Sequence, residues 1–172
     1  WVNSSLILYI CNMEKEMFSI VKIRFTDCDP IGHLNNVKYL KYMQDAREDH
    51  IEEFFGFSYD EYIKRTGCAW ITIKNQIAYL KEVKANTKVR ITSHTVNIDE
   101  KTTVVEILMT SEDRKTTHAV LWITAIYFNL KTRKTEEQPE DLKHLFHNSF
   151  LDLGNMSFDE RAEALRKENK AQ

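Results

Sequence analysis

The chain has 172 residues, a formal net charge of −2 at pH 7, 42% hydrophobic residues and 29% charged residues. These values are ordinary for one globular domain. No basic stripe accompanies the slightly acidic balance, so the composition gives no support to nucleic-acid binding. No apolar run approaches the roughly 20 residues that a membrane-spanning helix needs. We therefore expect neither a nucleic-acid partner nor a membrane partner.

The cysteines and the first residues bear on location and domain limits. Cys11, Cys28 and Cys68 form no CxxC pair, and an odd, widely spaced set is typical of a reducing compartment, so we expect a cytoplasmic protein. Residues 1–12 contain a short apolar run without a preceding basic residue, unlike a signal peptide. We interpret residues 1–12 as a leader or an expression remnant, residues 13–138 as the main domain, and residues 139–172 as a helical extension.

The first predicted elements are a strand and a long helix, joined by a polar turn. Phe18–Phe25 has apolar residues on both alternating faces, which is typical of a partly buried strand. Val37–Phe55 carries apolar residues at steps of three and four over about five turns, the pattern of a helix that lies against a sheet. Gly56 ends this helix.

A short helix and four strands follow. Ser58 and Glu61 have the spacing of a capping box, and Gly67 ends the helix that they begin. Short charged turns between the later strands predict sequential antiparallel pairing. The expected strands are Cys68–Leu80, with a break near Lys74–Asn75, then Lys88–Ile98, Thr102–Ser111 and Lys115–Leu130.

The elements together predict an α+β fold, with an antiparallel five-stranded sheet wrapped around one long central helix. The last strand, Lys115–Leu130, is apolar on both faces, whereas one helix covers only one face of a sheet. Pairing with a second copy is the simplest cover for the other face or for an open edge. After a polar link over residues 131–138, we expect a helical turn at Glu140–Phe146 and an amphipathic helix at Ser157–Lys170.

The polar turn before the long helix is the candidate site. The helix start at Asn36 offers unpaired N–H groups and the positive end of the helix dipole, which can hold a developing oxyanion. Asp29 beside it can act as a nucleophile or as a general base on water. His33 can assist either role. These residue types suit transfer of an acyl group to water.

Each of these residues also has an ordinary structural interpretation. Asp27 or Asp29 can cap the turn, His33 can be satisfied within it, and Asn35 and Asn36 are good helix caps.

The remaining candidates for reactive or metal-binding groups are weaker. Cys28 stands between two acids, which does not favour a nucleophilic thiolate. His144 and His147 lie three residues apart but lack a third ligand, so we expect no metal site there. We interpret His94 and His118, on predicted strands, as structural.

The whole run resembles a known family. Asp27-x-Asp29-x-x-Gly32-His33-x-Asn35-Asn36-x-x-Tyr39, followed by Ala46-Arg47, is similar to the 4-hydroxybenzoyl-CoA thioesterase family of hotdog-fold acyl-CoA thioesterases. The resemblance covers about residues 17–130. It implies a hotdog fold, no cofactor or metal, and hydrolysis of an acyl-CoA to a carboxylic acid and free CoA.

The resemblance also implies roles for individual residues. Asp29 would be the catalytic nucleophile or base, the N–H near Asn36 would polarise the thioester carbonyl, and His33 would orient water or substrate. In the family the acyl site lies between two subunits, which implies a homodimer or homotetramer. The remaining matches would bind substrate: Asp27, Gly32, Asn35 and Tyr39.

Three alternatives stay open. The segment from His33 to Tyr39 also resembles acyl-ACP thioesterases, but Ile31 stands where that group has an asparagine, and Glu82 is merely a candidate for its further carboxylate. The second alternative is a non-catalytic acyl-CoA-binding module. The third is a dimeric structural or interaction domain, which would leave the polar turn unexplained.

Overall fold

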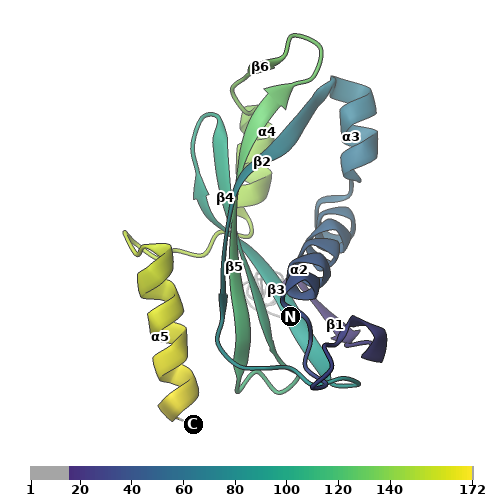
Figure 1. Ribbon diagram of the computed structural model, residues 1–172. Coiled ribbons are helices and arrows are strands. Elements are labelled where there is room, and N and C mark those ends of the chain that lie inside the picture. Colours follow the sequence, from purple (N-terminus) through teal and green to yellow (C-terminus); the bar gives the residue numbers. More distant parts are fainter. Residues whose placement is uncertain (1–15, 172) are drawn as a thin grey trace, which may run out of the picture.

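The computed structural model describes residues 16–171, in which a curved antiparallel sheet wraps around a long helix (Figure 1). This arrangement confirms the predicted α+β class and hotdog architecture. Residues 1–12 and Cys11, which the sequence analysis treated separately, lie outside the described residues. The strands are β1 (Phe18–Lys22), β2 (Cys68–Tyr79), β3 (Lys88–Ile98), β4 (Thr102–Ser111), β5 (Thr117–Asn129) and β6 (Lys134–Thr135). The helices are α2 (Asn36–His50), α3 (Tyr59–Thr66), α4 (Glu140–His147) and α5 (Phe158–Ala171).

The helices match the predictions closely. A π-helical turn, Ile51–Phe55, extends α2 to the predicted end, and Gly56 terminates it in a left-handed conformation with φ 75°. The predicted capping box of α3 is present, because the Ser58 side chain accepts from the Glu61 N–H and the Glu61 side chain accepts from the Ser58 N–H. No helix within residues 16–171 is long and apolar enough to cross a membrane.

The strand order is β1-β3-β4-β5-β2, with β6 added beside β5. The predicted sequential pairing is confirmed for β3, β4 and β5, whereas β2 pairs with β5 and not with β3, which follows it in the chain. The reason is the connection over residues 80–87. This connection does not form a hairpin, because it runs from β2 at one edge of the sheet to β3 near the opposite edge. On the way it hydrogen-bonds to Ile23, just after β1, and to the polar turn.

Three local details also differ from the sequence predictions. β1 ends at Lys22 rather than at Phe25, since Ile23 continues to bond to the crossing connection and Phe25–Asp27 forms a 3₁₀ turn. β2 is not interrupted near Lys74, because a bulge between Thr72 and Lys74 absorbs the irregularity and the strand continues. The polar link contributes the short β6, which makes six strands rather than five.

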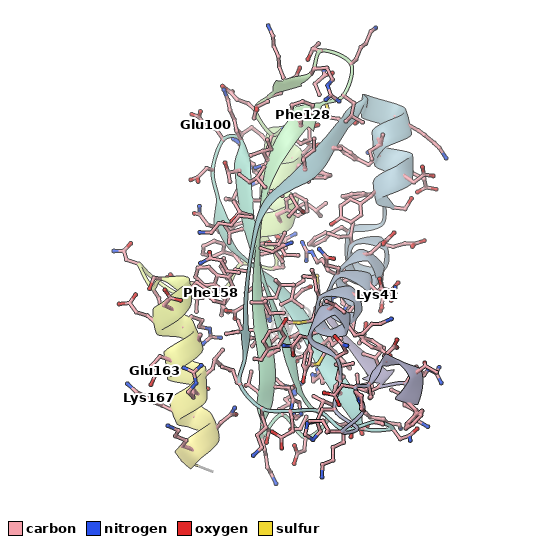
Figure 2. The ribbon with its side chains drawn as sticks, viewed as in Figure 1. Lys41, Glu100, Phe128, Phe158, Glu163 and Lys167 are labelled. Carbon is pink, nitrogen blue, oxygen red and sulfur yellow. The ribbon has the colours of Figure 1, made fainter. Side chains whose placement is uncertain are left out.

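The main core lies between α2 and the inner face of the sheet. Helical spacing places Tyr39, Met43 and Ala46 on the face of α2 that meets the strands, whereas Lys41 lies on the opposite side (Figure 2). The buried strand residues in this cluster include Val89, Ile91, Ile107, Met109, Ala119 and Leu121. This contact fixes the long helix, and with it the helix start, against the sheet.

The outer face of the sheet is covered in part by α5. Phe158, Ala162 and Leu165 of this helix form a buried cluster with Val120 of β5, and Phe158 lies between helix and sheet (Figure 2). Trp122 packs against the same cluster. A second subunit is therefore not needed to cover this part of β5, so the expectation of a partner on this face is wrong in its reason.

A buried ion pair holds α5 to the sheet. Glu106 of β4 is 0% exposed, and its carboxylate accepts hydrogen bonds from Arg161 of α5 at 2.9–3.3 Å and from the Trp122 indole N–H at 2.8 Å. A fully buried carboxylate depends on such partners.

A buried polar network ties α2 to β1 and β3. The Ser93 hydroxyl lies 2.8 Å from His50 Nδ1 and accepts from Arg47 Nη1 at 3.2 Å, while His50 Nε2 lies 3.0 Å from the Ser19 hydroxyl. Burial, and then the nearby Arg47 charge, lower the pKa of His50 from 6.5 to about 4. His50 is therefore neutral near pH 7.

We predict that Arg161→Ala destabilises the protein by about 3 kcal/mol, because it leaves the buried Glu106 carboxylate without its cation. Urea unfolding at pH 7 measures this change. The matched control is Arg166→Ala on the same helix, which removes an exposed pair with Glu163 and should cost less than about 0.5 kcal/mol. Equal effects of the two substitutions would contradict the anchoring role of Glu106.

We also predict a loss of stability as the pH falls from 6.5 towards 4. The unfolded chain binds a proton at His50 in this range and the folded chain does not, so acid favours unfolding, by roughly 3 kcal/mol from this group alone. Burial lowers the pKa values of His94 and His118 in the same direction. Unfolding free energies across this range should fall less steeply for His50→Gln than for the wild type, and identical slopes would refute the assignment.

Candidate functional site

Asp29 organises the polar turn. Its Oδ1 accepts from the N–H groups of Ile31 and His33, both at 3.0 Å, and its own N–H donates to the His33 carbonyl at 2.7 Å. The structural interpretation of Asp29 as a turn cap is therefore correct for one carboxylate oxygen. Within the described chain no donor occupies the other oxygen, Oδ2. Asp29 is held rigidly and keeps one oxygen available.

The crossing connection after β2 secures the turn from the other side. The Leu34 N–H donates to the Val83 carbonyl at 2.8 Å, and the Ala85 N–H donates to the Gly32 carbonyl at 3.2 Å. Gly32 itself has φ 82°, a left-handed conformation that favours glycine. The turn is thus bonded to a segment that lies about fifty residues later in the chain.

The start of α2 presents one open donor. Asn35 is the N-cap, with its side chain accepting from the Val37 N–H at 3.2 Å and its carbonyl accepting from the Lys38 N–H at 2.8 Å. No acceptor within residues 16–171 takes the Asn36 N–H. The Asn36 carbonyl accepts from the Tyr79 hydroxyl at 3.0 Å. The free N–H lies at the positive end of the helix dipole, where a negative charge is stabilised.

These groups meet in a cleft of about 250 Å³ between the turn, the helix start and the end of β2. It brings together Asp29, His33, Asn36 and Tyr39 from the predicted site. Its other lining residues are Leu34, Tyr79, Leu80, Lys81 and Glu82.

Glu82, the distant carboxylate that the family resemblance suggested as a candidate, lines this cleft. Its own backbone N–H, then Lys81, and also His33 lower the pKa of its carboxyl group. Tyr79 and Lys81 were not predicted as site residues, because nothing in their local sequence indicates where the end of β2 lies relative to the turn.

Tyr39 forms a wall of the cleft. It is 3% exposed, its hydroxyl oxygen accepts from the Val83 N–H at 3.2 Å, and its ring meets that of Tyr79 edge-on at 5.2 Å. Burial raises the pKa of Tyr39, so its phenol is neutral at physiological pH.

Asp27, Gly32 and Asn35 do not line the cleft. Asp27 accepts from the Lys38 ammonium at 2.8 Å and from the Tyr42 hydroxyl at 2.8 Å, and these hydrogen bonds lower the pKa of its carboxyl group. All three residues support the turn and the helix start. Their expected contacts with substrate stay a prediction.

The remaining candidates near the turn show neither an activated thiol nor a metal-binding group within the described residues. Burial, and then the charges of Asp29 and Asp27, raise the pKa of the Cys28 thiol, as the sequence led us to expect. Within residues 16–171 no group of three or more His, Cys, Asp or Glu side chains is placed to hold a metal ion.

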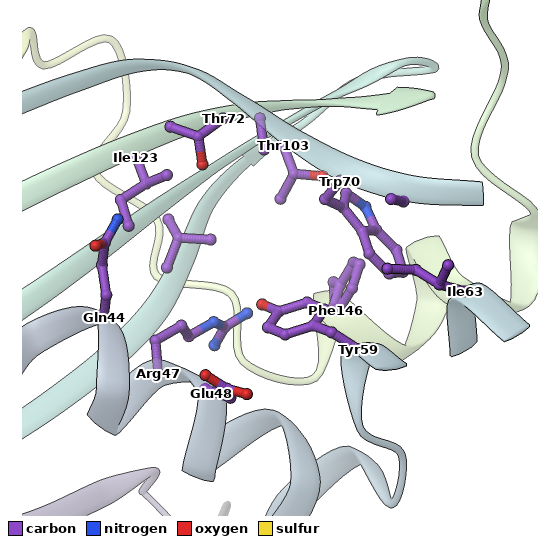
Figure 3. Close-up of a pocket in the computed structure, with 13 residues that line it drawn as sticks. Gln44, Arg47, Glu48, Tyr59, Ile63, Trp70, Thr72, Thr103, Ile123 and Phe146 are labelled. Atoms are coloured by element: carbon purple, nitrogen blue, oxygen red, sulfur yellow. The ribbon is translucent and has the colours of Figure 1, made fainter. Parts of the chain in front are cut away.

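A second cavity, of about 260 Å³, lies between α2 and the other end of the sheet (Figure 3). Its walls are mainly apolar and aromatic, and Arg47 and Gln44 of α2 reach into it. The walls include Ile63, Ala69, Trp70, Val105, Ile123, Ala125 and Phe146. We did not predict this pocket, because its lining comes from α2, α3, β2, β4, β5 and α4.

Comparisons with known proteins identify the family of this chain. A family model described as the thioesterase-like superfamily matches residues 23–146. The long-chain acyl-CoA thioesterase FadM of Escherichia coli is 25% identical over 114 residues, which cover 66% of this chain and 84% of that protein.

Two solved structures illustrate the similarity in fold. The protein SAV2348 of Staphylococcus aureus, solved in complex with CoA, has a TM-score of 0.72 at 16% identity, covering 84% of this chain and 89% of that one. Slr0204 of Synechocystis, a 1,4-dihydroxy-2-naphthoyl-CoA thioesterase, has a TM-score of 0.69 at 11% identity, covering 76% and 95%.

Proposed function

Because this chain belongs to the thioesterase-like superfamily, we propose that it hydrolyses an acyl-CoA to a carboxylic acid and free CoA. The observation that carries the proposal is the cleft that Asp29, His33 and Asn36 line together, where one Asp29 oxygen and the Asn36 N–H have no partner within the described residues. The names of the relatives support the same reaction, since FadM is an acyl-CoA thioesterase and SAV2348 binds CoA.

The reaction follows from these groups. The Asn36 N–H and the helix dipole stabilise the negative charge that develops on the thioester oxygen. Asp29 takes a proton from a water molecule as the water oxygen attacks the carbonyl carbon. The carbon–sulfur bond then breaks, and the proton passes to the CoA thiolate. Direct attack by Asp29, followed by hydrolysis of the resulting anhydride, gives the same products.

His33 has a supporting role in this scheme. Its backbone closes the turn onto Asp29, while its ring lines the cleft near Glu82. A ring in this position can orient the attacking water or the thioester. No hydrogen bond links the imidazole to a carboxylate within the described residues, so His33 lacks the firm orientation of a principal base.

We predict that Asp29→Asn lowers kcat by about a hundredfold or more, and that His33→Ala lowers it less. Release of free thiol from a panel of acyl-CoAs of different chain lengths measures turnover. The amide oxygen of asparagine can still accept from Ile31 and His33, so circular dichroism should be unchanged. Asp45→Asn, at an exposed acid on α2, is the control. Wild-type turnover in Asp29→Asn would refute the role of Asp29.

We also propose a homodimer, or a tetramer built from dimers, formed through the open edge of β2. This strand ends the sheet on one side, and its middle residues, Thr72–Asn75, are exposed, with Ile73 at 58%. Ile31 and Val37 beside the cleft are likewise apolar and 74% and 71% exposed. An unpaired edge with exposed apolar groups favours pairing with another copy.

Such pairing would join two features that are separate in one chain. The cleft lies at the Tyr79 end of β2, and the apolar pocket lies at its Cys68 end. Two β2 strands that pair antiparallel around their centres place the Tyr79 end of one against the Cys68 end of the other. The acyl group of a thioester bound in one cleft could then enter the pocket of the second copy.

We predict that sedimentation at micromolar concentration shows no monomer, and that Ile73→Lys shifts the protein towards monomer with a parallel loss of turnover. The added charge opposes edge pairing. Lys101→Glu, in the exposed turn between β3 and β4, changes charge elsewhere and serves as the control. A stable monomer with full activity would contradict the shared site.

The domain limits and location are part of the same proposal. The cleft residues all precede residue 139, which supports a catalytic domain over residues 13–138. The extension over residues 139–172 then adds Phe146 to the pocket wall and α5 to the outer face. The free thiols of Cys28 and Cys68 support a cytoplasmic location.

A further inference from the structure

Arg47 is a buried cation without a buried anion. It is 6% exposed, lines the apolar pocket, and its Nε has no hydrogen-bond partner. It forms no ion pair within residues 16–171. Arginine remains charged in proteins, and an unpaired buried charge is costly. This side chain therefore needs a second explanation besides packing.

The groups that touch Arg47 are all neutral. Its Nη1 donates to the Ser93 hydroxyl, and its guanidinium lies over the Phe55 ring, 5.6 Å from the centroid. The Tyr59 hydroxyl points towards it (Figure 3), and burial raises the pKa of that phenol. His50, which shares Ser93, is neutral near pH 7.

The nearest acidic residue on the pocket wall is Glu48. This side chain is exposed and lies beside Arg47 (Figure 3), but it forms no ion pair with it. Because solvent screens an exposed charge, Glu48 compensates Arg47 weakly and opposes a second anion weakly.

The rest of the pocket suits a chain of carbon atoms. Trp70, Ile63 and Phe146 form one end, and Ile123 and Thr72 lie across the space from Arg47 (Figure 3). An apolar chain fits these walls, while a carboxylate at its end can accept from the fork of the guanidinium. Such charge-assisted pairs are strong and directional.

We propose that this pocket receives the distal end of the acyl group and that Arg47 binds a carboxylate there, so that the preferred substrates are ω-carboxyacyl-CoAs. The proposal rests on the thioesterase function and on the β2 pairing proposed above, and it specifies the substrate class. Arg47 is then a specificity-determining residue that takes no part in bond breaking.

The test compares acyl-CoAs that differ in their last group alone. For chains of 6 to 12 carbons, kcat/KM is measured with a methyl, hydroxyl or carboxylate end. At the best chain length, we expect the carboxylate form to exceed the methyl form by about tenfold or more. Equal values for the hydroxyl and carboxylate forms, or no preference at any length, would overturn the proposal.

Substitutions test whether the preference for a carboxylate end depends on Arg47. Arg47→Met should abolish the advantage of the carboxylate, measured as the ratio of kcat/KM for carboxylate-ended and methyl-ended substrates in the same variant, and Glu48→Gln should increase that ratio. Arg65→Met, at an exposed arginine on α3, is the matched control and should keep the wild-type preference. A preference that survives Arg47→Met in a folded protein would refute the role of Arg47.

Binding separates this proposal from the thioesterase function. Titration of octanoyl-CoA and suberoyl-CoA into Asp29→Asn protein by calorimetry reports affinity without turnover, and suberoyl-CoA should bind about tenfold more tightly. Arg47→Met removes the hydrogen bond to Ser93 and could prevent folding. The binding measurement does not need that variant, so it tests the carboxylate site in either case. If suberoyl-CoA binds more tightly but the wild type hydrolyses neither thioester, the thioesterase function is overturned and the carboxylate site is retained. If the wild type hydrolyses both thioesters and binds them with equal affinity, the carboxylate site is overturned and the thioesterase function is retained.

Discussion

The backbone hydrogen bonds between residues 32–34 and residues 83–85 are the interaction on which the site depends. They join the polar turn to the connection that crosses the sheet after β2. Without them, Asp29 would sit on a loop anchored by the chain immediately around it. With them, the turn, the start of α2 and the end of β2 form one rigid cluster, which is the condition for positioned acid–base chemistry. The Tyr79 hydroxyl completes the cluster by holding the first carbonyl of α2.

The long helix separates two chemical environments. At its start, an unpaired N–H and the helix dipole meet Asp29, His33 and Glu82 in an open polar cleft. In its second half, Arg47 and the aromatic side chains of α3, β2 and α4 enclose an apolar pocket. The polar cleft and the apolar pocket thus share one helix, and its packing against the sheet fixes both. Association through β2 would combine the cleft of one copy with the pocket of another.

The two C-terminal helices pack on opposite faces of the sheet. α4 supplies Phe146 to the inner pocket, while α5 covers Val120 on the outer face and is fixed by Arg161 and Glu106. Both apolar faces of β5 are therefore covered, at least in part, by helices of the same chain. The exposed edge of β2 remains as the physical reason for the proposed self-association.

Most of the helices and strands, and the central residues of the candidate site, could be predicted from local sequence patterns. Periodicity and capping residues located the helices and most strand limits, because these signals are local. Asp29, His33 and Asn36 lie on one short run, so their proximity also followed from the sequence, as did the family resemblance. Four features became visible only in the folded chain: β2 pairs with β5, Glu82 and Tyr79 line the cleft, α5 covers the outer face, and Arg47 lines an apolar pocket. Each of these depends on contacts between distant segments, and neither alternation nor helical spacing records which edge or face a segment will meet.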